Sequence, residues 1–128
     1  RRRSTTTPVV VVGYIDRQNT GRNLPEPFHN WLTQYLSNHS QIDFRHLHME
    51  DLTPLEQIQA ASDLDVMVGG HGNGLSHMLW MTPRLYVLEF FWSMPFQFDY
   101  ATMAQIMKHS YTALFDGQTV KFMFIQVN

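Results

Sequence analysis

The run PVVVVGYI at residues 8–15 is the feature that most limits what this chain can fold into. It contains four consecutive valines and no charged side chain. A strand that is apolar at every position has no side suited to solvent, which is typical of strands in a parallel sheet with helices on both faces. The run therefore predicts a buried central strand of an α/β domain.

Strands and helices are expected to alternate along the rest of the chain. Residues 24–38 show the i, i+3, i+4, i+7, i+8 spacing of an amphipathic helix. The residues expected on its inner face are Phe28, Trp31, Leu32, Tyr35 and Leu36. A weaker strand, with blurred alternation that places it nearer an edge of the sheet, is expected over residues 42–49.

The second half of the chain continues this alternation. Thr53 and Glu56 form a capping box that begins a short helix. Apolar runs predict two more strands at residues 63–69 and 84–91, and a helix is expected over residues 95–110. The glycine-rich segment between those two strands leads into a further short helix.

The end of the chain has Asp116-Gly117 between two apolar runs, which is a signal for a hairpin turn. The order of elements predicts right-handed βαβ units on a mainly parallel sheet with flanking helices, a Rossmann-like arrangement. We expect one domain over residues 8–128. The polar opening at residues 1–7 is interpreted as a linker, which makes this chain the C-terminal part of a longer protein.

Composition excludes several classes of function. The formal net charge is −2, and three of the nine basic residues stand at positions 1–3, so no nucleic-acid partner is expected. Cysteine is absent, which rules out a disulfide framework and a cysteine zinc site. His46 and His48 share one strand face, but two ligands do not complete a metal site, so no metal is expected. Asn38-His39-Ser40 is an acceptor triplet for N-glycosylation and favours a lumenal protein.

The segment VMVGGHGNGLSHMLW, residues 66–80, places a glycine cluster directly after an expected strand. Ligands of open α/β sheets bind beyond the carboxyl ends of the strands. A helix beginning near Gly72 would direct free N–H groups and its positive dipole end toward such a ligand. The G-x-G-x-G pattern by itself leaves two interpretations open, an anion-binding turn and a turn that serves only close packing.

A second polar loop favours the anion-binding interpretation. Arg17 and Arg22 follow the first strand, with Asn19 and Gly21 between them, and this loop should open at the same sheet edge as the glycines. Two guanidinium groups facing a helix N-terminus suit a diphosphate. A solvated loop whose charges bind nothing is the alternative.

The chain resembles the family 61 glycosyltransferases over residues 9–111. Its segment HGNGLSHMLWMTPRLYVLEF, residues 71–90, is similar to the family stretch HGAGLTNMLFMPPGSVVLEI. The upstream segments YIDRQNTGRNL and LEQIQAASDLDVMVG match the family's arginine-bearing loop and glutamine-bearing helix. The chain departs from the family where Asn73 replaces alanine, His77 replaces asparagine and Arg84 replaces a glycine.

The resemblance implies the nucleotide-sugar half of a GT-B enzyme, in which two Rossmann-like domains face each other across a cleft. It implies an inverting transfer from a nucleotide-sugar donor, expected to be UDP-linked, to a glycan or glycoprotein acceptor, with neither a cofactor nor a required metal. The motif assigns His71, Gly72, Asn73 and Gly74, together with the two loop arginines, to the donor diphosphate.

The same resemblance implies partners and a place in the cell. An upstream domain of the same protein would supply most of the acceptor site, so this part is expected to be inactive alone. The protein is expected in the lumen of the Golgi or the endoplasmic reticulum, anchored through an upstream segment. The catalytic base stays unassigned, because neither Asp16 nor Asp43 stands out in the sequence.

Glu89 interrupts an otherwise apolar strand and needs an explanation, because a buried carboxylate is costly without partners. Contact with the ribose or base of the donor is one interpretation, and a solvent-facing position is the other. For the whole chain, the alternative to a transferase is a non-catalytic module that binds a sugar nucleotide or a protein. A serine hydrolase does not fit, since Ser76 in GLSHM lacks the second glycine of the nucleophile motif.

Overall fold

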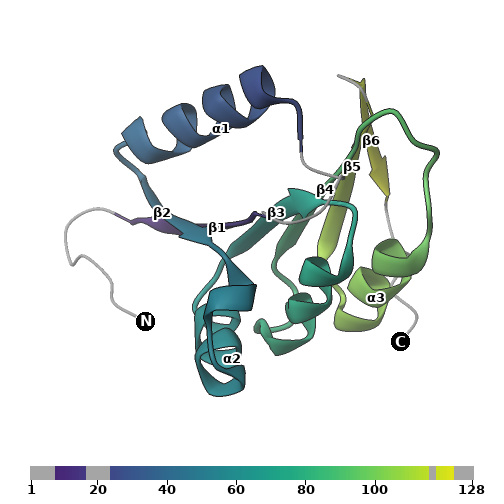
Figure 1. Cartoon of the computed structure of the whole chain (residues 1–128). Coiled ribbons are helices and arrows are strands. Elements are labelled where there is room, and N and C mark those ends of the chain that lie inside the picture. The colour runs from purple at the N-terminus through teal and green to yellow at the C-terminus, as the bar shows by residue number, and fades with distance from the viewer. Residues whose placement is uncertain (1–7, 17–23, 116–117, 123–128) are drawn as a thin grey trace.

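The computed structural model describes residues 8–16, 24–115 and 118–122. Within them a single sheet has the strand order β2-β1-β3-β4-β5-β6 (Figure 1). The strands are β1 (Val10–Ile15), β2 (Ile42–Leu47), β3 (Val66–Gly70), β4 (Tyr86–Phe91), β5 (Ser110–Phe115) and β6 (Gln118–Phe122). Neighbours from β2 to β5 pair in parallel, and β6 is antiparallel to β5. The predicted Rossmann-like α/β fold is confirmed.

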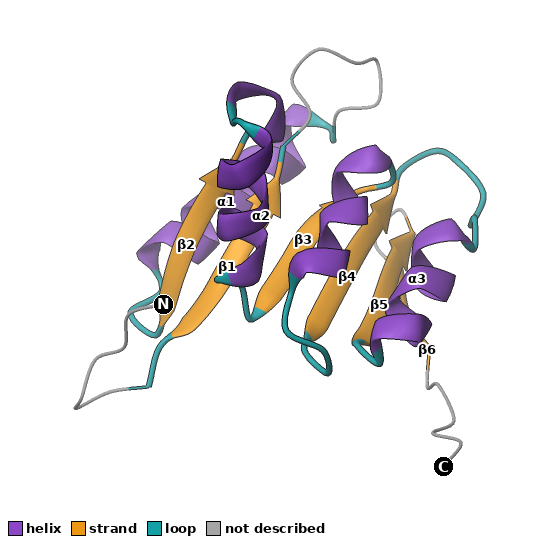
Figure 2. Ribbon diagram, turned by 90° about the horizontal axis from the view of Figure 1, so that it is seen from below, coloured by secondary structure: helices purple, strands orange, loops and turns teal. Residues whose placement is uncertain are grey.

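Helices cover both faces of this sheet. They are α1 (Glu26–Asn38), η1 (Met49–Asp51), α2 (Pro54–Ser62), η2 (Asn73–Trp80) and α3 (Asp99–Met107), of which η1 and η2 are 3₁₀-helices. Figure 1 shows α1 above the sheet and α2 and α3 below it, and Figure 2 shows the lower face with its helices in front of the strands. None of the helices in the described ranges has the length and apolar character needed to cross a membrane.

The sheet separates two hydrophobic clusters. On the α1 face, Val12 and Val68 pack with Leu32 and Leu36. On the opposite face a larger cluster extends from Ile15 across the sheet to the side chains of η2 and α3. Because β1 lies between β2 and β3, its residues 11, 12, 14 and 15 are all buried, as the valine run predicts. The prediction that the second strand lies at an edge is also confirmed.

The buried face of α1 is narrower than the helical spacing of its apolar residues predicts. Leu32 and Leu36 are buried, but Trp31 is 56% exposed and Tyr35 is 51% exposed. The expectation that these two aromatic residues face inward is therefore wrong. The helix contacts the sheet along a line of residues four apart, and the rings of Trp31 and Tyr35 stack on each other outside it, with centroids 5.5 Å apart.

The predictions made from local signals, for the start of a helix and for a hairpin, are confirmed. The capping box is present, since the Glu56 amide donates to Thr53 Oγ1 at 3.2 Å and the Thr53 amide donates to Glu56 Oε1 at 2.9 Å. The hairpin between β5 and β6 is confirmed by the pairing of Phe115 with Gln118. The turn residues Asp116-Gly117 themselves lie outside the described residues, as does the predicted linker at residues 1–7.

Arg84, where the resembling family has glycine, has a left-handed backbone with φ of 70°. Its amide donates to the carbonyl of Met107 at 3.2 Å, which anchors the turn before β4, and its side chain is exposed. A left-handed conformation costs an L-residue other than glycine about 1–2 kcal/mol. The position therefore stores a small strain that glycine would relieve.

We expect Arg84→Gly to raise the free energy of unfolding by about 1 kcal/mol, because glycine adopts positive φ without a Cβ clash. Urea denaturation of the purified protein measures this change. Arg84→Ala is the control, since it removes the same exposed side chain but keeps the strained backbone. A glycine variant no more stable than the alanine variant would contradict the assignment of strain.

Candidate functional site

The turn after β3 and the end of β1 lie next to each other at the carboxyl edge of the sheet. Ile15, the last residue of β1, pairs with Gly69 of β3. Beyond β3 the His71 amide still donates to the carbonyl of Phe90 at 2.9 Å, so the turn begins beside the end of β4 as well. This is the edge at which ligands of parallel α/β sheets bind.

Arg17 and Arg22 fall in residues 17–23, which lie outside the described residues. The two residues that flank this segment are placed, and both lie near the glycine turn. Asp16 directly follows β1, and Leu24 Cδ2 lies 3.9 Å from the position that a Cβ on Gly70 would take. The arginine-bearing segment therefore leaves and re-enters the described structure beside the glycines. A clamp formed by Arg17 and Arg22 on a diphosphate stays a prediction.

The glycines of the turn serve different purposes. Gly72, the N-cap of η2, has φ of 157° and ψ of 173°, a backbone region that is essentially restricted to glycine. Gly74 is needed for packing, since a Cβ there would lie 2.6 Å from Cγ2 of Ile15. The packing interpretation of the glycine pattern is therefore confirmed for Gly74, and the anion-binding interpretation stays a prediction.

The helix that follows begins at Asn73, close to where the sequence places it, but it is a 3₁₀-helix over all its eight residues. Its first ladder bond runs from the Leu75 amide to the Gly72 carbonyl at 3.1 Å. The amides of Asn73 and Gly74 precede this bond, and the first amides of a helix have no partner within it. Of Asn73 only the backbone is described. These amides are the groups that an anion at this edge would meet.

His71 belongs to a buried group of polar side chains that spans three strands. Its Nδ1 atom lies 2.6 Å from Glu89 Oε2, and the Tyr111 hydroxyl donates to Glu89 Oε1. His71 is 7% exposed and Glu89 is 0% exposed. The rings of Phe91 and Tyr100 pack against the imidazole, with centroids at 5.2 and 5.4 Å.

The neighbours of Glu89 in the sheet explain how a carboxylate fits there. Glu89 pairs with Gly69 on one side and with Ala113 on the other, so two small residues leave room for the His71 ring and the Tyr111 hydroxyl. Burial raises the pKa of Glu89 above its ordinary value, although the hydrogen bonds from Tyr111 and His71 act in the opposite direction. Burial and the neighbouring carboxylate raise the pKa of Tyr111.

A solvent-facing position for Glu89 is therefore wrong. The carboxylate holds His71 with its Nδ1–H donating, which sets the tautomer and the orientation of the ring. Contact between Glu89 and ribose or base stays a prediction, and both carboxylate oxygens already accept a hydrogen bond in this structure. The role of Tyr111 as a partner of Glu89 was not predicted from the sequence. The available signal was only that a carboxylate in a buried strand must have hydrogen-bond partners.

His109 is buried, whereas Asn38 lies at the surface. His109 is 2% exposed, its Nδ1 accepts a hydrogen bond from the Leu85 amide, and burial lowers its pKa, so it is a structural histidine. Asn38 is the last residue of α1 and is exposed. Its glycosylation stays a prediction.

The chain is similar to a known protein family. The family model described as Glycosyltransferase 61 matches residues 4–88. This range contains the arginine-bearing loop, the glycine turn and the whole of η2. No curated protein matches the chain.

The raised pKa of Glu89 leads to a prediction about stability. The folded state holds this proton more tightly than the unfolded chain does, so the linked stability is complete below the unfolded value near 4.5 and is lost as the pH rises through the folded value. We expect the unfolding free energy of wild type minus that of Glu89→Gln to fall as the pH rises above 4.5. Urea denaturation across this pH range measures it.

Glu56→Gln is the matched control, with the opposite sign. The hydrogen bond from the Thr53 amide lowers the pKa of Glu56, so the stability linked to this group is present at higher pH and is lost as the pH falls. The unfolding free energy of wild type minus that of Glu56→Gln should therefore rise with pH. Slopes of the same sign for both substitutions would refute the account of Glu89.

Proposed function

Because the chain belongs to glycosyltransferase family 61, we propose that it binds a nucleotide-sugar donor at the carboxyl edge of its sheet. Family membership indicates glycosyl transfer. The donor is proposed to be UDP-linked, the acceptor a glycan or glycoprotein, and the transfer inverting. An upstream domain of the same protein would complete a GT-B cleft, and the protein would act in the lumen of the secretory pathway.

One observation carries this proposal. The glycine turn, which lies inside the family match, is located at the carboxyl end of β3, directly beside the end of β1. The arginine-bearing loop departs from that end of β1 and returns at Leu24, next to Gly70. The residues that flank the arginine-bearing segment thus lie beside the glycine turn, at the edge where α/β sheets bind their ligands.

The chemistry of transfer fits such a site. As the bond from the anomeric carbon to the diphosphate breaks, negative charge grows on the leaving nucleoside diphosphate. Amides at the start of η2 and the guanidinium groups of Arg17 and Arg22 would stabilise that charge more strongly than the charge of the bound donor. Positive groups of the protein would then do the work that a cation does in other transferases.

His71 would contact the diphosphate or the donor sugar from the start of the turn. Glu89 and Tyr111 do not need to touch the donor for this role, because they hold the imidazole in place. The donating Nδ1 fixes which ring nitrogen carries the proton in neutral histidine. The catalytic base that activates the acceptor is proposed to lie in the upstream domain.

The arginines provide the sharpest test. We expect Arg17→Ala or Arg22→Ala in the intact protein to weaken binding of UDP about ten- to hundredfold, because each loses a charge-assisted contact of about 1.5–3 kcal/mol. Calorimetric titration measures this affinity, and a panel of UDP-sugars identifies the donor. A turnover assay with the preferred donor then separates a transferase from a module that binds without reacting.

Arg84→Ala is the matched control, since Arg84 is exposed and lies before β4, at the opposite edge of the sheet. It should leave the affinity for UDP unchanged. If both loop variants bind UDP as tightly as wild type does, the diphosphate clamp is wrong. If the intact protein binds no sugar nucleotide at all, the proposed donor site itself is wrong.

The turn offers an independent pair of variants. We expect Gly72→Ala to weaken UDP binding at least about tenfold, because a side chain at φ of 157° distorts the backbone that presents the amides. Gly70→Ala should bind normally, since its Cβ would make only an ordinary contact with Leu24 at 3.9 Å. Melting and titration of one sample separate folding from binding. A folded Gly72→Ala protein with wild-type affinity would leave the turn as a packing device.

A further inference from the structure

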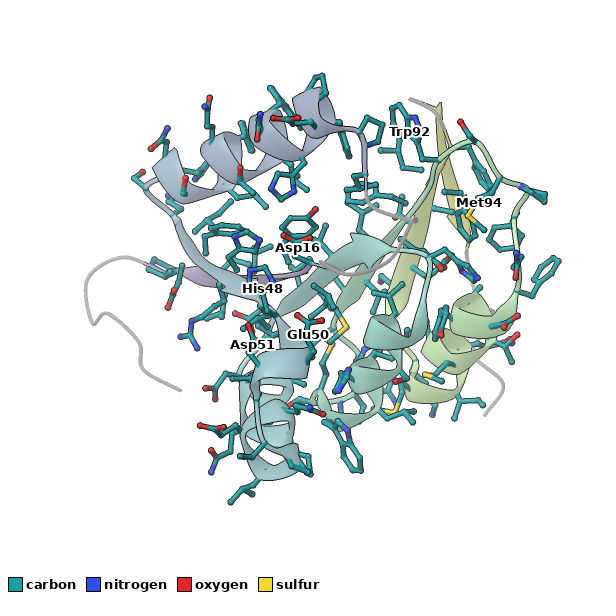
Figure 3. The ribbon with its side chains drawn as sticks, in the orientation of Figure 1. Asp16, His48, Glu50, Asp51, Trp92 and Met94 are labelled. Atoms are coloured by element: carbon teal, nitrogen blue, oxygen red, sulfur yellow. The ribbon has the colours of Figure 1, made fainter. Side chains whose placement is uncertain are left out.

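Asp16, His46 and His48 form a group, here called the His–His–Asp cluster, at the ends of β1 and β2. Asp16 directly follows β1, and its amide donates to the carbonyl of Leu47 at 2.9 Å. His46 lies in β2 and His48 directly follows it, so the two imidazoles are two residues apart and share one face of the sheet. Figure 3 shows Asp16 and His48 close together at these strand ends.

The donor atoms of the cluster converge. One ligand atom from each of the three residues lies within 4.8 Å of the other two. Asp16 Oδ2 is 2.7 Å from His46 Nε2, and the rings of His46 and His48 have centroids 4.7 Å apart. In a tetrahedral zinc site with bonds of about 2.0–2.2 Å, neighbouring ligand atoms are about 3.3 Å apart. Small side-chain rotations would therefore suffice to surround an ion.

His48 supplies a second, independent observation. Its Nδ1 atom is buried and has no hydrogen-bond partner among the residues that the structure describes. Glu50 Oε1 lies 3.7 Å from this nitrogen, beyond hydrogen-bond distance. A buried imidazole nitrogen without a partner is costly, and a metal ion relieves this cost in either orientation of the ring. In one orientation Nδ1 of His48 binds the ion. In the other, Nε2 binds the ion and Nδ1–H donates to Glu50, as the second ring nitrogen of metal-bound histidines commonly donates to a carboxylate.

The ring of His46 is already oriented. It stacks on Tyr14 with centroids 5.3 Å apart, and the Tyr14 hydroxyl is hydrogen-bonded to Nδ1 of His29 at 2.9 Å. The Asp16–His46 hydrogen bond alone would account for two members of the cluster, but it leaves His48 unexplained. A shared cation accounts for all three.

We propose that Asp16, His46 and His48 bind a divalent transition-metal ion, zinc foremost. Two imidazoles and one carboxylate suit zinc and its neighbours, whereas magnesium and calcium prefer sites made wholly of oxygen atoms. Three protein ligands leave a fourth position for water. The ion joins the end of β1 to the end of β2 and replaces the Asp16–His46 hydrogen bond with two metal bonds.

This site lies on the opposite face of the sheet from His71 and Glu89. Tyr14, which stacks on His46, belongs to the hydrophobic cluster on the α1 face of the sheet. Phe91 packs on His71 and Tyr111 donates to Glu89, and both belong to the hydrophobic cluster on the opposite face. The metal proposal therefore rests on residues other than His71 and Glu89. It also corrects the interpretation that His46 and His48 lack a third ligand, because parallel pairing brings Asp16 to them.

The test is zinc titration of the intact protein after treatment with EDTA. We expect wild type to bind one more equivalent of zinc than His48→Gln or Asp16→Asn, and to show a rise in Tm with ZnCl₂ that MgCl₂ does not produce. Each substitution should weaken this site about a hundredfold or more, since even residues that only support a ligand contribute about 10–100-fold. Cobalt substitution, read by visible absorption, reports the coordination directly.

His39→Gln is the control, because His39 lies at the end of α1, outside the cluster. It should keep the zinc site intact. Equal zinc binding in wild type, His48→Gln and Asp16→Asn would overturn the proposal, and so would an equal loss in the His39→Gln control. Circular dichroism checks that each variant is folded. Asp16→Asn retains a side chain that can hydrogen-bond to His46, so it provides the decisive comparison if the histidine variant unfolds.

Discussion

The parallel pairing of β1 with both β2 and β3 is the constraint on which the rest of this structure depends. It aligns Ile15 with Leu47 on one side and with Gly69 on the other, so that three strands end at one edge. The glycine turn and the His–His–Asp cluster both lie at this edge, and the arginine-bearing segment begins there after Asp16. A different register would separate them, because each is positioned by the end of a strand.

Glu89 imposes the second requirement. A carboxylate in the centre of a buried strand must be hydrogen-bonded, and its partners come from the end of β3 and from β5. Gly69 and Ala113 beside it keep space open for those partners. Hydrogen bonds offset part of the cost of burying this carboxyl group and also set the orientation of His71, so a structural requirement and the geometry of the candidate site are met by the same contacts.

Much of the fold was predictable because its signals are local. The valine run, the capping box of Thr53 and Glu56 and the hairpin before β6 each depend on a few neighbouring residues. The inward face of α1 was predicted too broadly, since spacing alone does not say how wide the contact with the sheet is. Trp31 and Tyr35 fit the helical pattern yet lie outside that contact. The character of η2 as a 3₁₀-helix likewise had no clear signal in the apolar spacing of its residues.

By itself the sequence determined the α/β class, the central place of the first strand and the position of the glycine turn at a strand end, because these follow from local patterns of apolar residues and glycine. Tertiary structure alone decided which distant side chains meet. Tyr111 is hydrogen-bonded to Glu89, which is 22 positions away in the sequence, and Asp16 is hydrogen-bonded to His46, which is 30 positions away. The physical reason is that such partners are chosen by strand order and register, which arise from the packing of the whole sheet.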